Sequence, residues 1–168
     1  MTDITYYDPL PEQVLQLSAE INTAKLARLY RARKGHSYIY GWTGTGKSIV
    51  SRRLASRLKA DYFNYELLTL SQWKSGFDEI AVRVLNSDKK VVIIDGFFPL
   101  GVDVKFQTLI AELNRKGVNL FIFSQEPPSG DYPSQYQKHE FVPDVFETIV
   151  EFRYGTLARY PVTFHQVK

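Results

Sequence analysis

The stretch that decides the fold is Gly41-Trp42-Thr43-Gly44-Thr45-Gly46-Lys47-Ser48, in a chain of 168 residues. Just before it, residues 36–40 (HSYIY) are short, aromatic and β-branched, which is typical of a strand. Just after the last glycine, residues 47–59 (KSIVSRRLASRLK) have apolar residues at helical spacing. The glycine-rich stretch is therefore predicted to be a turn that joins a strand to a helix.

This turn has the pattern G-x-x-x-x-G-K-S of the phosphate-binding P-loop, in the strand–turn–helix context that the pattern requires. Glycines permit positive φ and close backbone approach, and successive N–H groups at the start of a helix form a nest for an anion. All eight residues 41–48 are expected to bind nucleotide, with Lys47 on the β- and γ-phosphates and Ser48 on Mg²⁺. The alternative is a glycine-rich turn without a ligand.

A second candidate is the carboxylate that ends the apolar run of residues 90–95 (KVVIID). Asp95 is predicted to lie beside the P-loop strand as a Walker B aspartate, within reach of the Mg²⁺ shell. Alternatively, it caps the turn before Gly96. Many NTPases place a glutamate directly after this aspartate to activate water, but here Gly96 follows, so the base must come from elsewhere.

Two further candidates follow predicted strands, and the carboxyl ends of parallel strands converge on the ligand crevice. Glu66 ends the predicted strand 61–66 and is the candidate catalytic base; otherwise it is a solvated charge. Gln125 follows the buried strand 119–124 (NLFIFS) and is expected to contact the γ-phosphate or the attacking water. Its alternative role is to cap the turn.

Helices and strands alternate along most of the chain. Helices are expected at 11–34, 77–85 and 104–116 in addition to 47–59, and the runs 148–153 and 162–167 predict a C-terminal β-hairpin. Strands that are apolar throughout favour a parallel sheet covered on both faces. The fold class is therefore predicted to be α/β, a three-layer P-loop NTPase fold with a mostly parallel central sheet and an antiparallel C-terminal hairpin.

Composition excludes several classes of protein. The chain has no Cys and only three His, which leaves no disulfide framework, no thiol nucleophile and no credible zinc site. No apolar run approaches the roughly 20 residues that a membrane helix needs, and residues 1–10 do not resemble a signal peptide. The expected compartment is the cytoplasm.

Charge is unevenly distributed. Residues 24–59 contain many Lys and Arg but no Asp or Glu. Residues 126–151 contain several Asp and Glu, and their one Lys or Arg is Lys138. Such a division favours attraction of a polyanion, or contact between the basic and acidic sides of two subunits. Two solvated faces are the alternative.

With these features placed, the chain resembles the RecA-like ATPase core of RecA, KaiC and the replicative hexameric helicases. The resemblance covers residues 36–168 and rests on the P-loop, the strand that ends at Asp95, the strand end FIFSQ and the C-terminal segment from HEFVPDVFETIVEF onward. Residues 1–35 are then an N-terminal helical segment that packs on or beside this core, within one globular domain.

The resemblance implies Mg²⁺-dependent ATP hydrolysis at a subunit interface of a homo-oligomeric ring or filament, or within a larger assembly. It matches Glu66 with the catalytic glutamate and Gln125 with the γ-phosphate-sensing glutamine. Arg153, Arg159 and Lys168 are candidates for the cation that a neighbouring subunit supplies; otherwise they protect a sheet edge.

The resemblance also implies that nucleic acid is a possible partner, because loops 96–103 and 126–140 match loops that face it. The aromatic residues of these loops would stack on bases, or pack within their own domain. They are Phe97, Phe98, Tyr132 and Tyr136.

Two other functions stay open. The segment LASRLKADYFNYELL resembles an AAA+ ATPase or a small P-loop kinase, and the missing glutamate after Asp95 favours a nucleotide-dependent interaction module or AAA+-like loader with little turnover. IIDGF is similar to nucleoside monophosphate kinases. Against a small-molecule kinase, no Arg-rich lid follows Gln125.

Overall fold

A six-stranded sheet with the order β2-β3-β4-β1-β7-β8 forms the centre of the molecule in a computed structural model. The structure describes residues 12–65, 73–97, 103–126, 129–130, 139–140, 145–152 and 162–166. The elements are α1 (Glu12–Ala32), β1 (His36–Gly41), α2 (Lys47–Leu58), β2 (Asp61–Asn64), α3 (Trp73–Leu85), β3 (Val91–Phe97), α4 (Asp103–Lys116), β4 (Asn119–Ser124), β5 (Ser129–Gly130), β6 (His139–Glu140), β7 (Phe146–Phe152) and β8 (Val162–Gln166).

The predicted α/β class is confirmed. Neighbouring strands from β2 through β7 are parallel, which gives a five-stranded parallel sheet. Strand β8 pairs antiparallel with β7. Residues 153–161, which would complete the predicted hairpin, lie outside the described residues.

Two features of the sheet differ from the sequence-based expectation. Strand β3, which ends near Asp95, does not lie next to β1, because β4 pairs with both and separates them. The short antiparallel pair β5–β6 was not expected in the polar, proline-rich segment after Gln125. Local pattern does not encode strand order, which depends on the packing of the crossover helices.

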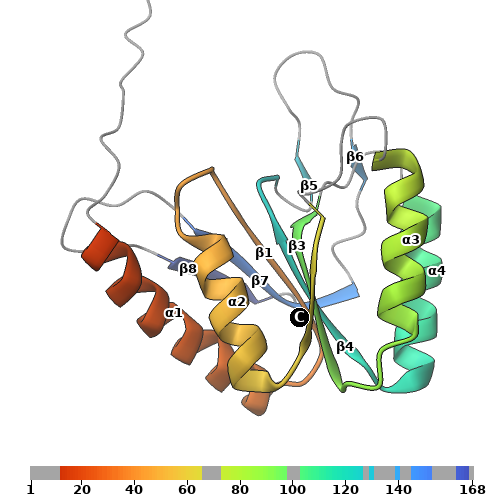
Figure 1. Cartoon of the computed structure of the whole chain (residues 1–168), viewed down its shortest axis with the longest axis horizontal. Helices are drawn as coiled ribbons and strands as arrows, with labels where there is room; N and C mark the ends of the chain where they lie inside the picture. Colours follow the sequence, from red (N-terminus) through yellow and green to blue (C-terminus); the bar gives the residue numbers. More distant parts are fainter. Residues whose placement is uncertain are drawn as a thin grey trace, which may run out of the picture.

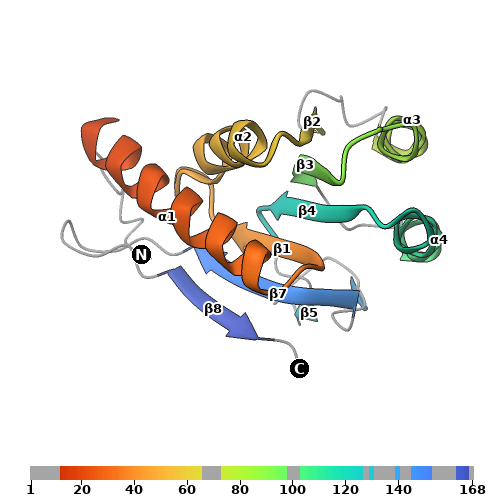
Figure 2. The same cartoon turned by 90° about the horizontal axis from the view of Figure 1, so that it is seen from below.

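Helices cover both faces of the sheet (Figure 1). Figure 2 shows α1 and α2 on one side and α3 and α4 on the other. Successive strand residues point to opposite faces, so Tyr38 belongs to the core under α3 and α4, and Ile39 to the core under α1 and α2. Both faces are therefore apolar, and this explains the uninterrupted apolar runs of β3 and β4.

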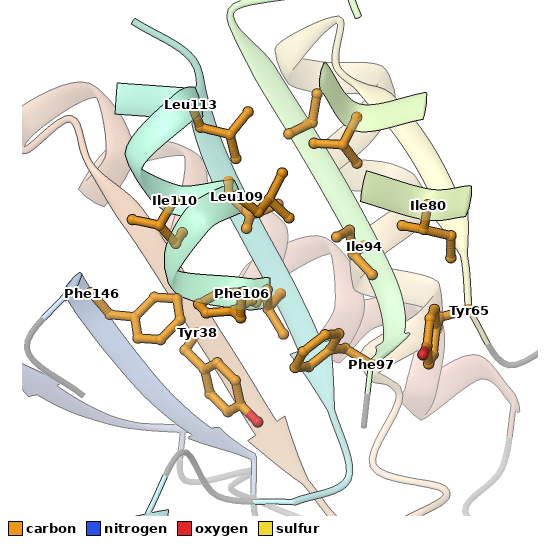
Figure 3. Packing of buried hydrophobic residues seen from close by; sticks show 14 of the residues in the cluster. Tyr38, Tyr65, Ile80, Ile94, Phe97, Phe106, Leu109, Ile110, Leu113 and Phe146 are labelled. Atoms are coloured by element: carbon orange, nitrogen blue, oxygen red, sulfur yellow. The ribbon is translucent and has the colours of Figure 1, made fainter. Parts of the chain in front are cut away.

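Of the two alternatives for Phe97, a loop residue that stacks on nucleic acid is wrong, and packing within its own domain is confirmed. Phe97 ends β3 and is 1% exposed. Its ring centroid lies 5.9 Å from that of Tyr65 and 5.7 Å from that of Phe106 (Figure 3). Gly96, at φ 74°, lies at a shift in the β3–β4 register, which puts Phe97 in the α3–α4 core while Asp95 faces α2.

The N-terminal helix lies along α2. Its buried face includes Ala19, Leu26 and Ala27, which belong to the same core as Val50 and Leu54 of α2. A hydrogen bond of 2.6 Å from Arg53 Nη2 to Gln16 Oε1 also links the two helices. This packing brings the first half of α1 beside the glycine-rich turn.

Candidate functional site

The glycine-rich turn between β1 and α2 has the backbone conformation that its glycines permit. Gly44 and Gly46 adopt φ of 83° and 85°, in the left-handed region that disfavours other residues. At Gly41 the lack of a side chain matters for steric reasons too. A Cβ at Gly41 would lie 2.3 Å from the carbonyl oxygen of Phe152, so only glycine lets β1 approach β7 this closely.

The ammonium group of Lys47 lies inside this turn. Its Nζ donates to the carbonyl oxygens of Gly41 and Trp42, at 2.5 and 2.8 Å, and to Thr45 Oγ1 at 3.3 Å. Thr45 Oγ1 in turn donates to the Trp42 carbonyl at 2.8 Å. Lys47 is buried, so these acceptors compensate for the loss of water around its charge.

A pocket of about 390 Å³ opens beside the turn. It is lined by Leu15, Thr43, Gly44, Gly46, Lys47, Ser48, Ile49 and Gln125. The structure therefore brings five of the eight predicted residues of the turn together with Gln125, which follows a strand far away in sequence; Gly41 and Thr45 are not among the lining residues. Trp42 does not line the pocket, and its side chain is 76% exposed, so it contributes only its backbone here.

The position of Gln125 follows from the end of β4. The Tyr38 hydroxyl donates to the Glu126 carbonyl at 2.9 Å, and the Glu126 N–H donates to Ser124 Oγ at 3.0 Å. Burial is the main reason that the pKa of Tyr38 is raised far above its ordinary value, so this hydroxyl keeps its proton. These bonds hold the chain on both sides of Gln125.

Asp95 is buried next to α2, where it accepts two hydrogen bonds that the sequence did not predict. The hydroxyls of Ser51 and Tyr62 each donate to Asp95 Oδ2 at 2.7 Å. Ser51 lies one turn after Ser48 on α2, and its Oγ is also 2.9 Å from the Ser48 carbonyl oxygen, a second acceptor that shares its single hydroxyl proton. Asp95 is thus connected to the start of α2 through Ser51, rather than through a hydrogen bond to the Ser48 side chain.

Tyr62 remains a hydrogen-bond donor at neutral pH. Burial raises the pKa of its phenol, and the neighbouring carboxylate of Asp95 raises it further, while Arg52 and Ser51 oppose the shift. A deprotonated Tyr62 would place a second negative charge against Asp95. The protonated phenol instead stabilises the carboxylate.

Ser48 and Asp95 are the residues predicted to hold a metal that arrives with a nucleotide. Mg²⁺ usually takes one or two protein ligands and completes its shell with water and phosphate oxygens. Among the described residues, no group of three or more His, Cys, Asp or Glu side chains could hold a metal without a nucleotide. Ser48 lines the pocket, whereas Asp95 is buried and is not among the pocket's lining residues, so a shared metal on these two side chains stays a prediction.

Several predicted residues lie outside the described part of the chain. They are Glu66, Phe98, Tyr132, Tyr136, Arg153, Arg159 and Lys168. Their roles stay predictions. The residue before Glu66 is described: the Tyr65 N–H donates to the Asp95 carbonyl at 2.7 Å, so the chain leaves β2 beside Asp95.

Sequence reasoning missed Leu15 and Ile49 as pocket residues and Ser51 and Tyr62 as partners of Asp95. Ser51 was discoverable, because a residue three positions after Ser48 lies on the same side of the helix. Leu15 was not, because its place at the pocket depends on how α1 packs against α2. Its Cδ2 would lie 3.8 Å from a Cβ at Gly46.

Comparison with known proteins shows no family for this chain. No protein-family model matches the chain, and no curated protein matches it. Among solved structures, it is similar to one titled "Crystal Structure of the DnaI", with 17% identity, coverage of 89% of this chain and 94% of that one, and a TM-score of 0.44. Within the described residues, no helix is long and apolar enough to cross a membrane.

Proposed function

We propose that this chain binds ATP with Mg²⁺ in the pocket beside the glycine-rich turn and hydrolyses it. The observation that carries the proposal is that one pocket is lined by the turn, by Lys47 and Ser48 at the start of α2, and by Gln125 from the end of β4. These are the groups that phosphoryl transfer to water needs for positioning and charge stabilisation.

The turn would bind the phosphates with its backbone N–H groups and the positive end of α2. Lys47 would exchange its carbonyl partners for phosphate oxygens, which are stronger acceptors because they are charged. Leu15 and Ile49 provide apolar surface for the nucleobase. Ser48 and Asp95 would hold Mg²⁺, which neutralises charge that develops on the phosphate oxygens.

Hydrolysis requires a group that orients or deprotonates water, and we assign this role to Glu66. The support is its sequence position directly after Tyr65, whose backbone is bonded to that of Asp95. Gln125 would contact the γ-phosphate or the attacking water from the other side of the pocket.

The test is nucleotide binding and turnover by the wild-type chain and Lys47→Ala, with Lys25→Ala as a control for an exposed lysine on α1. Titration calorimetry should show Mg·ATP binding by the wild type and the control, and at least about a hundredfold weaker binding by Lys47→Ala, because charge-assisted contacts to the phosphates are lost. Equal affinity for all three proteins would contradict the proposal. Circular dichroism confirms that each variant is folded.

A second function is a nucleotide-dependent interaction module or AAA+-like loader with little turnover. The observation that favours it is Gly96, which follows Asp95 where many NTPases have a catalytic glutamate. Glu66→Gln separates the two functions, because a catalytic base is needed for turnover but not for binding. Loss of turnover at unchanged ATP affinity supports the ATPase; a wild type that binds ATP and never hydrolyses it supports the module.

The RecA-like resemblance further suggests a homo-oligomer in which Arg153 or Arg159 completes a neighbour's site, coupled to nucleic acid or to a partner assembly. Turnover per subunit should then rise steeply with protein concentration. Turnover that stays constant over a wide dilution series would exclude an arginine that acts between subunits.

A further inference from the structure

A second pocket, of about 460 Å³, lies along the C-terminal half of α2, on the side of β2, the edge strand of the sheet. It is lined by Arg52, Ala55, Ser56, Lys59, Ala60, Tyr62 and Lys89. The glycine-rich turn is at the other end of α2 (Figure 1), and the two pockets have no lining residue in common. Nothing in the proposed ATP site accounts for this pocket.

The pocket is strongly positive. Three cations, Arg52, Lys59 and Lys89, line it, and no carboxylate is among its lining residues in the described chain. The nearby acid Asp88 pairs with Lys89 at 3.3 Å but is 84% exposed, so water screens that pair. Asp61 accepts a hydrogen bond of 2.6 Å from Ser87 Oγ. The net positive charge of the lining therefore favours an anion.

Lys59 occupies a position that would favour glycine. It follows the last residue of α2 with φ 52° and ψ 43°, the left-handed conformation that ends many helices. A residue with a side chain is disfavoured in this conformation by about 1–2 kcal/mol, and Lys59 is the non-glycine residue that adopts positive φ in the described chain. Lys59 therefore brings its positive charge to the pocket from the end of α2.

The remaining surface suits an unpaired base. Tyr62 forms one wall, and its hydrogen bond to Asp95 holds the ring in place before any ligand binds. Ala55 and Ala60 add apolar surface beside it. A cationic groove with an aromatic wall is the arrangement that binds single-stranded nucleic acid, in which phosphates contact the cations and a base packs on the ring.

We infer that this pocket binds the backbone of single-stranded nucleic acid, with phosphates on Arg52, Lys59 and Lys89 and a base against Tyr62. The inference names a partner and a surface for the proposed ATPase, on a different part of the molecule from loops 96–103 and 126–140. It is tested without ATP, so its failure and the failure of ATP binding are separate results.

The test is fluorescence anisotropy of a labelled oligothymidylate of about 16 nucleotides, a length at the upper end of known site sizes, over a series of salt concentrations. The full chain, Lys59→Gly, Lys89→Ala and the control Lys25→Ala are compared. Lys59→Gly is the decisive variant, because it removes the charge and relieves the backbone strain. It should be at least as stable as the wild type in urea, so weaker binding cannot result from unfolding.

We expect Lys59→Gly and Lys89→Ala each to weaken binding severalfold and to reduce the slope of log K against log salt by about 0.7, the change for one phosphate contact on a single strand. Lys25→Ala should leave both unchanged. The inference is overturned if the wild type does not bind at low salt, if both pocket variants bind as the wild type does, or if a duplex competes more strongly than the single strand.

Discussion

Asp95 shows how single residues build the candidate site. A carboxylate that is 3% exposed has lost its water, and burial of an unpaired charge costs several kcal/mol. The hydroxyls of Ser51 and Tyr62 replace that water with two hydrogen bonds of 2.7 Å each. Two neutral donors thus stabilise the charge without neutralising it, which leaves Asp95 able to act on a cation.

Removal of either hydroxyl should therefore destabilise the fold. Ser51→Ala and Tyr62→Phe each delete one hydrogen bond to a charged acceptor, and each should lower the free energy of unfolding by about 1.5–3 kcal/mol. The measurement is urea denaturation followed by circular dichroism. The control is Ser56→Ala, an exposed serine on the same helix, which should change stability by less than about 0.5 kcal/mol. If Ser51→Ala is as stable as the control, the bond to Asp95 does not support the fold.

At the scale of elements, the contact between β1 and β7 depends on Gly41. The two strands are parallel neighbours, and Gly41 pairs with Phe152 at the end from which the glycine-rich turn begins. The close approach of Gly41 to the Phe152 carbonyl sets where the turn leaves the sheet. The position of the turn is thus a property of two strands that are far apart in sequence.

The substitution Gly41→Ala should force β1 and β7 apart. Gly117→Ala is the control, because it strains the backbone without a steric clash. Both glycines have positive φ, 154° and 65°, but a Cβ at Gly117 would meet nothing within 4 Å. We expect Gly117→Ala to cost about 1 kcal/mol from strain, and Gly41→Ala about 3 kcal/mol or more because overpacking adds to it. Thermal or urea unfolding of the two variants measures the difference. Equal losses would show that space at Gly41 is unimportant.

At the scale of the whole molecule, the buried side chain of His36 joins three elements. It begins β1, its Nε2 lies 2.9 Å from Asn114 Oδ1 of α4, and its Nδ1 accepts a bond of 3.0 Å from the Leu120 N–H of β4. Since Nδ1 is an acceptor, the proton of the neutral ring is on Nε2, which donates to Asn114. Burial lowers the pKa of His36, and the Asn114 bond opposes this only in part.

The fold should therefore lose stability in mild acid. Below about pH 6.5 the unfolded chain binds a proton at His36, whereas the folded chain does not bind it until the pH is lower. The contribution of His36 to the free energy of unfolding therefore falls as the pH falls through that value, and it is constant at higher pH. The slope from one group reaches at most about 1.4 kcal/mol per pH unit. Urea midpoints between pH 5 and 8 measure it. His36→Gln should show a flatter profile; an unchanged profile would assign the effect to other groups.

Much of this architecture was predictable from local pattern. The strand–turn–helix around residues 36–58, the buried strand 119–124 and the helix 103–116 were predicted within a few residues, because apolar periodicity and glycine placement are local properties. The convergence of Gln125 with the turn was also predicted, since parallel strands end at one edge of a sheet. The role of Gln125 in catalysis stays a prediction.

What the chain encodes locally is therefore the α/β class, the glycine-rich turn and the residue types around it, because each depends on neighbours within a few positions. Tertiary structure alone decided that β4 lies between β1 and β3 and that Phe97 is buried in the core. It also decided that Ser51 and Tyr62 donate hydrogen bonds to Asp95, and that α1 places Leu15 at the pocket. Each of these depends on which distant surfaces pack together. That choice is made by burial of apolar area over the whole molecule, and no short stretch of sequence contains it.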